Sequence, residues 1–299
     1  MDALKIAVIG LDTSHSIAFP KLMNDPTCAP DLQVAGLRVV SCLRFETPFQ
    51  DAKGLDARQQ QLEAWGVKVT TCLDEALVDC DAIMMEINDP AYHLDYFQRL
   101  AALGKPIFLD KPLAGTLADG RAIIAEMKRC GTRVWSASSL PFAPGIQAAI
   151  DAVGGAVSVG HCFGALGTAP AGDSLIWYGV HSFEMLQRLM GSGAQSVRAV
   201  DLGPAVVTTV DYGNGRYGVI ESIRNQWQYG GRAQSSKQSA FFDVDSSRIY
   251  HDLLLQIKAF FLGAEPPISM EKTFEGLAMM CAARQSIAGD GAAVPVEKL

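Results

Sequence analysis

The segment Gly10–Ser16, which reads G-L-D-T-S-H-S, constrains the fold of this chain more than any other stretch. It follows Lys5–Ile9, a short apolar run with β-branched residues that predicts a buried strand. The residues after it, Ile17–Met23, can begin a helix. A strand that turns at a glycine into a helix is where a doubly wound sheet binds the phosphates of a dinucleotide. The segment therefore predicts an N-terminal Rossmann domain.

The glycine pattern of this segment departs from the usual G-x-G-x-x-G, because Asp12 and His15 stand where the second and third glycines are expected. The second glycine normally lets the backbone approach the pyrophosphate, and the third allows close packing of the helix. A carboxylate at Asp12 opposes phosphate binding unless it turns away or binds the ribose. Hydroxyl groups and helix N–H groups can still hold an anion, although Thr13 or Ser14 could equally be an ordinary N-cap.

We expect this loop to contact a cofactor despite its two replaced glycines. The predicted cofactor-binding residues of the loop are Gly10, Leu11, Asp12, Thr13, Ser14 and His15.

Length and composition exclude several classes of protein. A chain of 299 residues, 49% of them hydrophobic, fits two domains of ordinary size. A net charge of −7 without a dense run of Lys or Arg argues against nucleic acid or an anionic membrane as a partner. The seven cysteines are scattered without a C-x-x-C, so neither a disulfide framework nor a metal site is expected. With no signal peptide or membrane-spanning run in view, a soluble cytoplasmic protein is expected.

The first part of the chain alternates strand-like and helix-like stretches, which predicts a parallel sheet covered on both faces over residues 1–138. The expected strands are Lys5–Ile9, Val34–Leu43, Val67–Cys72, Asp81–Ile87, Pro106–Leu109 and Arg133–Ala137. The expected helices are Leu55–Trp65, Asp74–Val78, Tyr92–Leu103 and Thr116–Arg129.

The pattern changes near Ser138, and residues 139–299 predict an α+β domain with a large, mostly antiparallel open sheet. Asn214-Gly215 is a strong hairpin signal between two of its strands. The expected strands are Val157–Leu166, Ser196–Leu202, Ala205–Tyr212, Tyr217–Arg224 and Ser239–Val244. The expected helices are Ile146–Val153, Gly179–Met190, Ile249–Phe261 and Thr273–Ile287.

Three motifs resemble segments of the Gfo/Idh/MocA oxidoreductases. Gly104–Leu113, G-K-P-I-F-L-D-K-P-L, is similar to the family's G-K-h-V-x-x-E-K-P, where h is apolar, with Asp110 in place of the usual Glu. Asn88-Asp89-Pro90 and His93 are similar to its T-P-x-x-x-H. Gly179-Val180-His181, followed by Glu184, is similar to its G-x-H-x-x-D. The chain is thus identified as a divergent member of this family.

The resemblance implies a Rossmann domain followed by an α/β domain whose open sheet often forms the interface of a homodimer or homotetramer. It also implies NAD or NADP as cofactor and hydride transfer at a hydroxyl or carbonyl of a sugar, cyclitol or polyol-like substrate. On the same grounds Asn88 and His93 are expected to line the cofactor site.

Lys111 and His181 are the expected catalytic residues. Lys111 follows a strand at the carboxyl edge of the sheet, and Pro112 sets the local backbone, so the ammonium could polarise a substrate oxygen. The alternative is a solvated surface lysine. The resemblance implies that His181 faces the nicotinamide, where an imidazole could act as general acid or base; the alternative is a hydrogen-bonded core histidine.

Two further residues are expected to line the substrate site. Trp177 stands where the family often has an Asp four residues before the histidine, and an indole cannot transfer a catalytic proton. It could instead form an aromatic wall for the apolar face of a substrate. Glu184 lies three residues after His181 on one helix face, where it could orient the imidazole or substitute for an acid.

The choice of cofactor depends on the stretch after the second strand. Arg44 would suit the 2′-phosphate of NADP, whereas Glu46 would suit the ribose hydroxyls of NAD. We favour NADP.

The replaced glycines and Trp177 leave a second hypothesis open. A non-catalytic or cofactor-poor relative could use the same fold to bind a ligand or to regulate another protein. A lyase or hydrolase that retains a tightly held cofactor is a third possibility.

Overall fold

The computed structural model describes residues 3–299, which form two compact units. The first unit contains the chain up to Ala114, then Ala122–Ala137 and Tyr250–Met270. The second contains Gly115–Arg121, Ser138–Ile249 and Glu271–Leu299. The longest continuous stretch of the second unit begins at Ser138, and residues 115–121 and 250–270 each belong to a different unit from their neighbours in the sequence.

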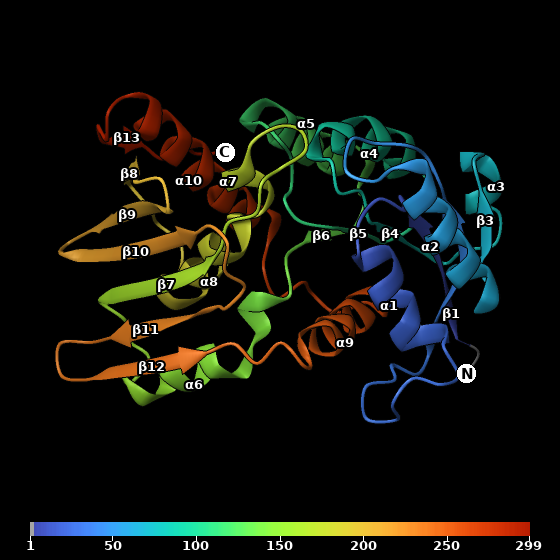
Figure 1. The fold of residues 1–299 in the computed structure, drawn as a ribbon, viewed down its shortest axis with the longest axis horizontal. Coiled ribbons are helices and arrows are strands. Elements are labelled where there is room, and N and C mark those ends of the chain that lie inside the picture. The colour runs from blue at the N-terminus through green and yellow to red at the C-terminus, as the bar shows by residue number, and fades with distance from the viewer. Residues whose placement is uncertain (1–2) are drawn as a thin grey trace. The chain divides into compact units, whose positions relative to one another are not determined.

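The first unit is built on a six-stranded parallel sheet with the strand order β3-β2-β1-β4-β5-β6 (Figure 1). Its strands are β1 (Leu4–Ile9), β2 (Leu37–Leu43), β3 (Lys68–Thr70), β4 (Ala82–Met85), β5 (Ile107–Leu109) and β6 (Val134–Ser136). This is the order of a dinucleotide-binding fold, and the direction of winding reverses between β1 and β4. Ligands bind at that reversal, outside the carboxyl ends of the strands. The predicted Rossmann sheet is confirmed.

Within residues 3–130, five α-helices connect these strands. The first contains the helix start expected at Ile17–Met23, and the other four are the expected helices with small shifts at their ends. The five are α1 (His15–Asn24), α2 (Ala52–Ala64), α3 (Leu73–Leu77), α4 (His93–Ala101), preceded by the short 3-10 helix η1 (Pro90–Tyr92), and α5 (Leu117–Cys130). Gly66 follows α2 with φ +77°, the left-handed conformation expected of a glycine that ends a helix.

Helix α9 (Ile249–Phe261) returns from the second half of the sequence to the first unit. Its Phe260 ring lies 6.0 Å from Trp135 of β6 in an edge-on contact. Lys258 Nζ donates a hydrogen bond to the carbonyl of Ala35 at 2.7 Å. At the start of α9, Tyr250 contacts the ring of His15 at 5.2 Å. The first unit is therefore completed by residues more than 100 positions downstream of its last strand.

The second unit is built on a seven-stranded sheet with the order β12-β11-β7-β10-β9-β8-β13. Its strands are β7 (Val159–Ala165), β8 (Ser196–Asp201), β9 (Ala205–Gly213), β10 (Arg216–Ile223), β11 (Gly230–Gln234), β12 (Ser239–Asp243) and β13 (Val294–Pro295). All neighbours are antiparallel except β7 and β10. The predicted mixed α/β class with an antiparallel second sheet is confirmed.

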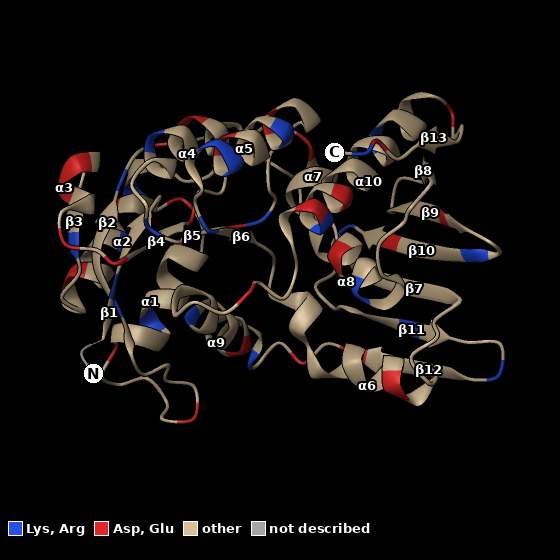
Figure 2. Cartoon of the chain, turned by 180° about the vertical axis from the view of Figure 1, so that it is seen from behind, with Lys and Arg blue, Asp and Glu red and all other residues tan. Residues whose placement is uncertain are grey.

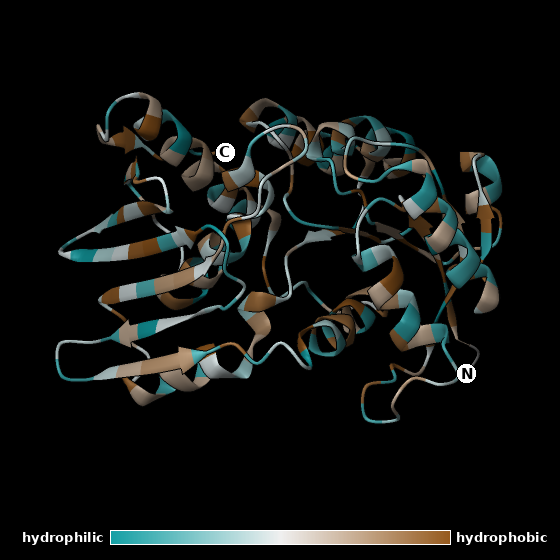
Figure 3. Cartoon of the chain, in the orientation of Figure 1, coloured by the Kyte–Doolittle hydropathy of each residue, from teal (hydrophilic) through white to brown (hydrophobic). Residues whose placement is uncertain are grey.

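One face of this sheet is covered by helix α8 (Val180–Met190). The missing side chains of Gly160 and Gly218 leave room for Leu186, since a Cβ at either glycine would come within 3.0 Å of its side chain. Buried and more exposed positions alternate along β9 and β10. Hydrophilic and hydrophobic residues are interspersed along the strands of this sheet (Figure 3). The helices of the second half outside α9 are α6 (Pro144–Ala152), preceded by η2 (Leu140–Phe142), α7 (Ser174–Trp177), α8 (Val180–Met190) and α10 (Met270–Ala288).

The hairpin between β9 and β10 turns at Asn214 and Gly215, whose φ angles of +55° and +74° suit a type I′ turn. The sequence predicted this turn but not β11, whose residues G-G-R-A-Q lack the β-branched side chains of a typical strand. A Cβ on Gly231 would overlap the carbonyl of His161 on β7. Close approach of neighbouring backbones therefore explains the glycine in this strand.

Charged residues of both signs are interspersed along the helices, for example on α4 and α5 (Figure 2). Among residues 3–299, none of the helices combines the length and apolar character needed to cross a membrane.

Candidate active site

Gly10 retains the role of the first glycine in a dinucleotide-binding turn. Its φ of +108° is left-handed, and a Cβ there would overlap the carbonyl oxygen of Glu86 at the end of β4. The turn after β1 therefore lies directly against β4, at the point where the strand order reverses.

Asp12 is buried in this turn, with 1% of its surface exposed. Its Oδ1 accepts a hydrogen bond from the backbone N–H of Asn88 at 2.9 Å, and its Oδ2 accepts one from the hydroxyl of Thr47 at 2.7 Å. Burial raises the pKa of Asp12, although these two hydrogen bonds act in the opposite direction. The carboxylate thus points toward the segments that follow β2 and β4.

The rest of the loop uses backbone and hydroxyl groups. Thr13 Oγ1 accepts from the backbone N–H of His15 at 3.3 Å, whereas Ser14 is exposed and makes no side-chain cap at the start of α1. Leu11 buries its side chain, and its carbonyl accepts from Arg58 Nη1 at 2.9 Å. Arg58 therefore brings a positive charge to the loop, and the Ser14 hydroxyl is open to a ligand.

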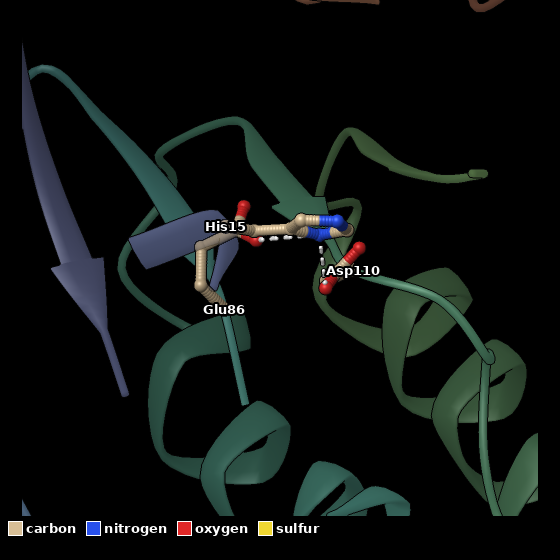
Figure 4. Close-up of side chains that lie close together, drawn as sticks. All are labelled: His15, Glu86 and Asp110. Carbon is tan, nitrogen blue, oxygen red and sulfur yellow. Dashed lines mark hydrogen bonds and ion pairs between the residues drawn. The ribbon is translucent and has the colours of Figure 1, made fainter. Parts of the chain in front are cut away.

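His15 meets two carboxylates from neighbouring strand ends (Figure 4). Its Nδ1 lies 2.8 Å from Oδ2 of Asp110, which follows β5, and 3.9 Å from Oε2 of Glu86, which follows β4. Glu86 and Asp110 are fully buried, and His15 is 6% exposed. Burial and the nearby Asp110 raise the pKa of Glu86 well above its usual value; burial opposes ionisation of Asp110 too, but His15 and Lys111 lower its pKa.

Lys111 is 4% exposed, so the alternative of a solvated surface lysine is wrong. It follows Asp110 at the carboxyl end of β5, and its backbone N–H donates to Asp110 Oδ1 at 2.8 Å. A cis peptide joins it to Pro112. Its positive charge acts on both Asp110 and Glu86. The structure thus brings Lys111 and the altered glycine loop to the same edge of the sheet.

Asn88 and His93 hold the segment after β4. The side chain of Asn88 approaches the Asp12 carbonyl at 3.5 Å. The fully buried His93 ring places its Nε2 2.9 Å from the Ile87 carbonyl and its Nδ1 3.2 Å from the Leu113 carbonyl. These contacts link the loop after β4 to the segment after Lys111, so His93 positions backbone that borders the site.

Arg44 lies at the end of β2 but is engaged by helix α2. Its guanidinium lies 2.6 Å from Asp56 and donates to Gln59 at 2.6 Å. A 2′-phosphate at this position would compete with the Asp56 carboxylate for the arginine.

The other expected site residues belong to the second unit. His181, 9% exposed, makes edge-on contacts with the rings of Tyr178 at 5.3 Å and Tyr229 at 5.9 Å. Trp177 lies 5.0 Å from Tyr178, and Trp227 lies 5.8 Å from the same ring. The histidine thus sits in an aromatic cluster of which Trp177 is part.

Glu184 is buried, and its Oε2 accepts a hydrogen bond from the backbone N–H of Ser138 at 2.8 Å. This contact holds the beginning of the second unit against α8.

Sequence reasoning missed Glu86, Thr47 and Arg58 as residues of the loop region. Glu86 carried a usable signal, because it is the one charged residue in the apolar run A-I-M-M-E-I that enters the sheet. A carboxylate in such a run is buried, and buried carboxylates are uncommon without a partner.

Comparison with known proteins supports this description. Residues 51–138 match the model of the Gfo/Idh/MocA oxidoreductase family, described as an NAD-binding Rossmann fold. The matched segment begins after the altered loop and includes the K-P motif. A search of curated protein sequences gave no significant match.

Solved structures match the chain over its whole length at low sequence identity. Myo-inositol 2-dehydrogenase from Lactobacillus plantarum has a TM-score of 0.80 at 12% identity and covers 99% of this chain and 100% of its own. Myo-inositol dehydrogenase from Corynebacterium glutamicum has a TM-score of 0.79 at 15% identity and covers 99% of this chain and 100% of its own. An oxidoreductase from Agrobacterium radiobacter in complex with NAD⁺, L-tartaric acid and magnesium has a TM-score of 0.74 at 15% identity. It covers 98% of this chain and 98% of its own.

These matches establish that the chain has the fold of the inositol dehydrogenases in both of its units. Together with the family model over residues 51–138, they confirm the resemblance to the Gfo/Idh/MocA oxidoreductases that the motifs indicated.

Proposed function

We propose that this chain is an NAD(P)-dependent oxidoreductase that transfers a hydride at a hydroxyl or carbonyl of a sugar, cyclitol or polyol-like substrate. The observation that carries the proposal is the buried Lys111 at the carboxyl end of β5, beside the turn after β1. This lysine lies at the edge where a sheet with the order β3-β2-β1-β4-β5-β6 binds its ligand.

The residues present fit a dinucleotide except at one position. Gly10 keeps the close turn, Ser14 offers a hydroxyl at the start of α1, and Arg58 supplies a positive charge. Asp12 is the exception, because it places a carboxylate where backbone would approach the pyrophosphate. Its two hydrogen bonds direct this carboxylate toward Asn88 and Thr47. We therefore expect the loop to bind the cofactor, with a lower affinity than a loop that has glycine at this position.

When bound, the nicotinamide supplies the hydride acceptor or donor. The ammonium of Lys111 donates a hydrogen bond to the reacting oxygen and stabilises negative charge that develops there. His181 takes or returns the hydroxyl proton through its imidazole. Trp177, with Tyr178 in contact, provides an aromatic surface for the apolar face of a ring-shaped substrate.

The substrate class rests on the inositol dehydrogenases among the structural matches. Between the two cofactors, we retain the preference for NADP because the cation Arg44 directly follows β2. Its ion pair with Asp56 predicts that this preference is small.

We also propose a homodimer or homotetramer that forms through the second sheet. Three large apolar side chains on its strands are exposed: Val200 on β8 by 47%, Tyr217 on β10 by 47% and Phe241 on β12 by 79%. The strands that carry them are separated by β11, β7 and β9 in the sheet order, so they add apolar area at three places on the sheet that such an interface would cover. The seven cysteines are all free thiols, which supports a reducing, cytoplasmic location.

Titration of the full-length protein with NADPH and NADH, followed by nicotinamide fluorescence, tests the proposal. Binding of at least one cofactor below millimolar concentration, followed by turnover with inositols or hexoses, is expected. If neither cofactor binds at millimolar concentration, the oxidoreductase proposal is wrong and the second candidate function replaces it.

That second candidate is a non-catalytic relative that binds a small ligand, which the buried Asp12 and the Trp177 replacement favour. It predicts that Lys111→Ala leaves the biological role intact. A turnover that depends on Lys111 excludes it.

A further inference from the structure

We propose that His15, Glu86 and Asp110 form a binding site for a divalent first-row transition-metal ion such as Mn²⁺ or Zn²⁺. The three residues come from the start of α1, the end of β4 and the end of β5 (Figure 4). The sequence predicted no metal site, because its cysteines are scattered and these three residues lie far apart along the chain.

The distances between the three side chains suit one shared ion. Their ligand atoms lie within 4.8 Å of one another. The Nδ1 of His15 is 2.8 Å from Asp110 Oδ2 and 3.9 Å from Glu86 Oε2. Two ligand atoms that each lie about 2.1 Å from an ion, at angles between about 90° and about 109°, are separated by about 3.0–3.4 Å. Small side-chain movements therefore bring all three onto a metal.

Glu86 supplies a second observation that points to a ligand. It is fully buried, and no N–H or hydroxyl group of residues 3–299 donates to either of its carboxylate oxygens. Its carboxylate is directed toward His15 and Asp110 (Figure 4). A buried carboxylate without a donor is destabilising unless a proton or a cation neutralises it. A metal ion bound by the three residues provides that neutralisation.

The donor set selects the kind of ion. One imidazole nitrogen and two carboxylate oxygens suit Zn²⁺, Mn²⁺ or Fe²⁺, whereas Mg²⁺ and Ca²⁺ prefer oxygen ligands alone. Three protein ligands leave a coordination position open, as at catalytic metal sites. The His15 ring is held by contacts with Phe19 at 5.0 Å and Tyr250 at 5.2 Å, which orient its nitrogen toward the carboxylates.

The charges near the cluster permit a divalent ion. Asp110 and Glu86 contribute two negative charges when ionised, and Lys111 contributes one positive charge nearby. With a neutral imidazole as ligand, the side chains of Glu86, Asp110 and Lys111 carry a net charge of −1. A bound divalent ion brings the net charge of the site to +1. The altered third glycine is essential to this site, because only its replacement by a histidine provides the nitrogen ligand.

Metal binding is measured without cofactor or substrate, so its outcome is independent of the oxidoreductase proposal. The full-length protein is stripped with EDTA and dialysed, then titrated with MnCl₂ and ZnCl₂ by calorimetry. Mn²⁺ binding is also followed by loss of the free-ion electron paramagnetic resonance signal. We expect about one ion per chain and a higher melting temperature with metal.

Two variants and a control locate the ion. Glu86→Gln and His15→Gln each remove one ligand and are expected to weaken binding by at least about tenfold. The control Glu221→Gln alters a partly exposed His–Glu pair of the second unit, in which His161 Nε2 lies 2.9 Å from Glu221, and should leave the stoichiometry and affinity unchanged. Circular dichroism verifies that each variant is folded.

The wild-type titration alone can overturn the proposal, even if both ligand variants fail to fold. Absence of bound Mn²⁺ and Zn²⁺ at millimolar concentration means that a proton shared by Glu86 and Asp110 neutralises the cluster instead. Equal binding by the wild type and a folded Glu86→Gln variant places the ion elsewhere and also overturns it.

Discussion

The imidazole of His15 and the carboxylate of Asp110 lie 2.8 Å apart, although 95 residues separate them in the sequence. His15 replaces the third glycine of the dinucleotide loop, and Asp110 replaces the glutamate of the family's K-P motif. The two departures from the family pattern therefore meet in space. Their contact connects the loop after β1 to the residue that precedes Lys111.

Replacing Lys111 by alanine should lower kcat of the oxidoreductase by about 10²–10⁴-fold, the usual contribution of a positioned acid or base. The loss is expected because the buried ammonium is the group proposed to bind the reacting oxygen. Steady-state kinetics with the best inositol or hexose substrate measures it. Lys53→Ala, at an exposed position of α2, is the matched control and should retain full activity.

Replacing Asp12 by glycine restores the second glycine of the loop and should tighten NAD(P)H binding. Removal of a carboxylate near the pyrophosphate relieves like-charge repulsion, which at about 4 Å and an effective dielectric constant of about 20 amounts to about 4 kcal/mol at most. We therefore expect affinity to rise by about tenfold or more in a fluorescence titration. An unchanged or weaker affinity would show that the carboxylate contacts the cofactor favourably, for instance at a ribose hydroxyl.

Asp12→Asn should raise the free energy of unfolding at neutral pH. Burial raises the folded-state pKa of Asp12 above its unfolded value. The contribution of Asp12 to the free energy of unfolding is therefore most favourable at a pH below its unfolded-state pKa. That favourable contribution is lost as the pH rises through the folded-state pKa. Asparagine avoids this loss, which amounts to about 1.4 kcal/mol for each pH unit by which the folded-state pKa exceeds the unfolded one, while its amide keeps the Asn88 contact.

Urea denaturation at pH 7 and at pH 3 measures this difference. The stabilisation by Asp12→Asn should be present at pH 7 and should shrink at pH 3, where the aspartate is protonated in both states. A stabilisation of the same size at both pH values would contradict an ionisation effect.

His181→Asn should lower kcat with little change in NAD(P)H affinity if the imidazole moves the substrate proton. The aromatic contacts with Tyr178 and Tyr229 hold the ring in place, so the variant removes a proton carrier from an ordered cluster. Parallel kinetics and cofactor titration separate the two effects. Full activity in the variant would assign His181 to the core instead.

The sequence predicted the parts of the fold and site that depend on local pattern. The β1 strand, the turn at Gly10 and the type I′ hairpin at Asn214-Gly215 follow from neighbouring residues, because short-range sterics decide them. The His15–Glu86–Asp110 cluster depends on how the start of α1 and the ends of β4 and β5 meet, so no local pattern indicated it.

The sequence also did not predict that residues 250–270 belong to the first unit. The apolar face of α9 is visible in the sequence, but its partner is not: Phe260 could pack on any apolar surface until the fold places Trp135 beside it. Low β-propensity concealed β11 for a different reason, because its glycines are required by close contacts with β7 and not by a turn.

A pair of glycine substitutions tests this last explanation. Gly231→Ala should destabilise the second unit by about 1–3 kcal/mol or more, because the new methyl group overlaps the His161 carbonyl and approaches Phe242. Gly276→Ala, in helix α10, is the control. A Cβ at Gly276 would have Gln187 Oε1 as its one close neighbour among residues 3–299, at 3.9 Å. Alanine should stabilise that helix by about 0.5–1 kcal/mol. Chemical denaturation that found both variants equally stable would mean that β11 tolerates a side chain, and that its glycines have another cause.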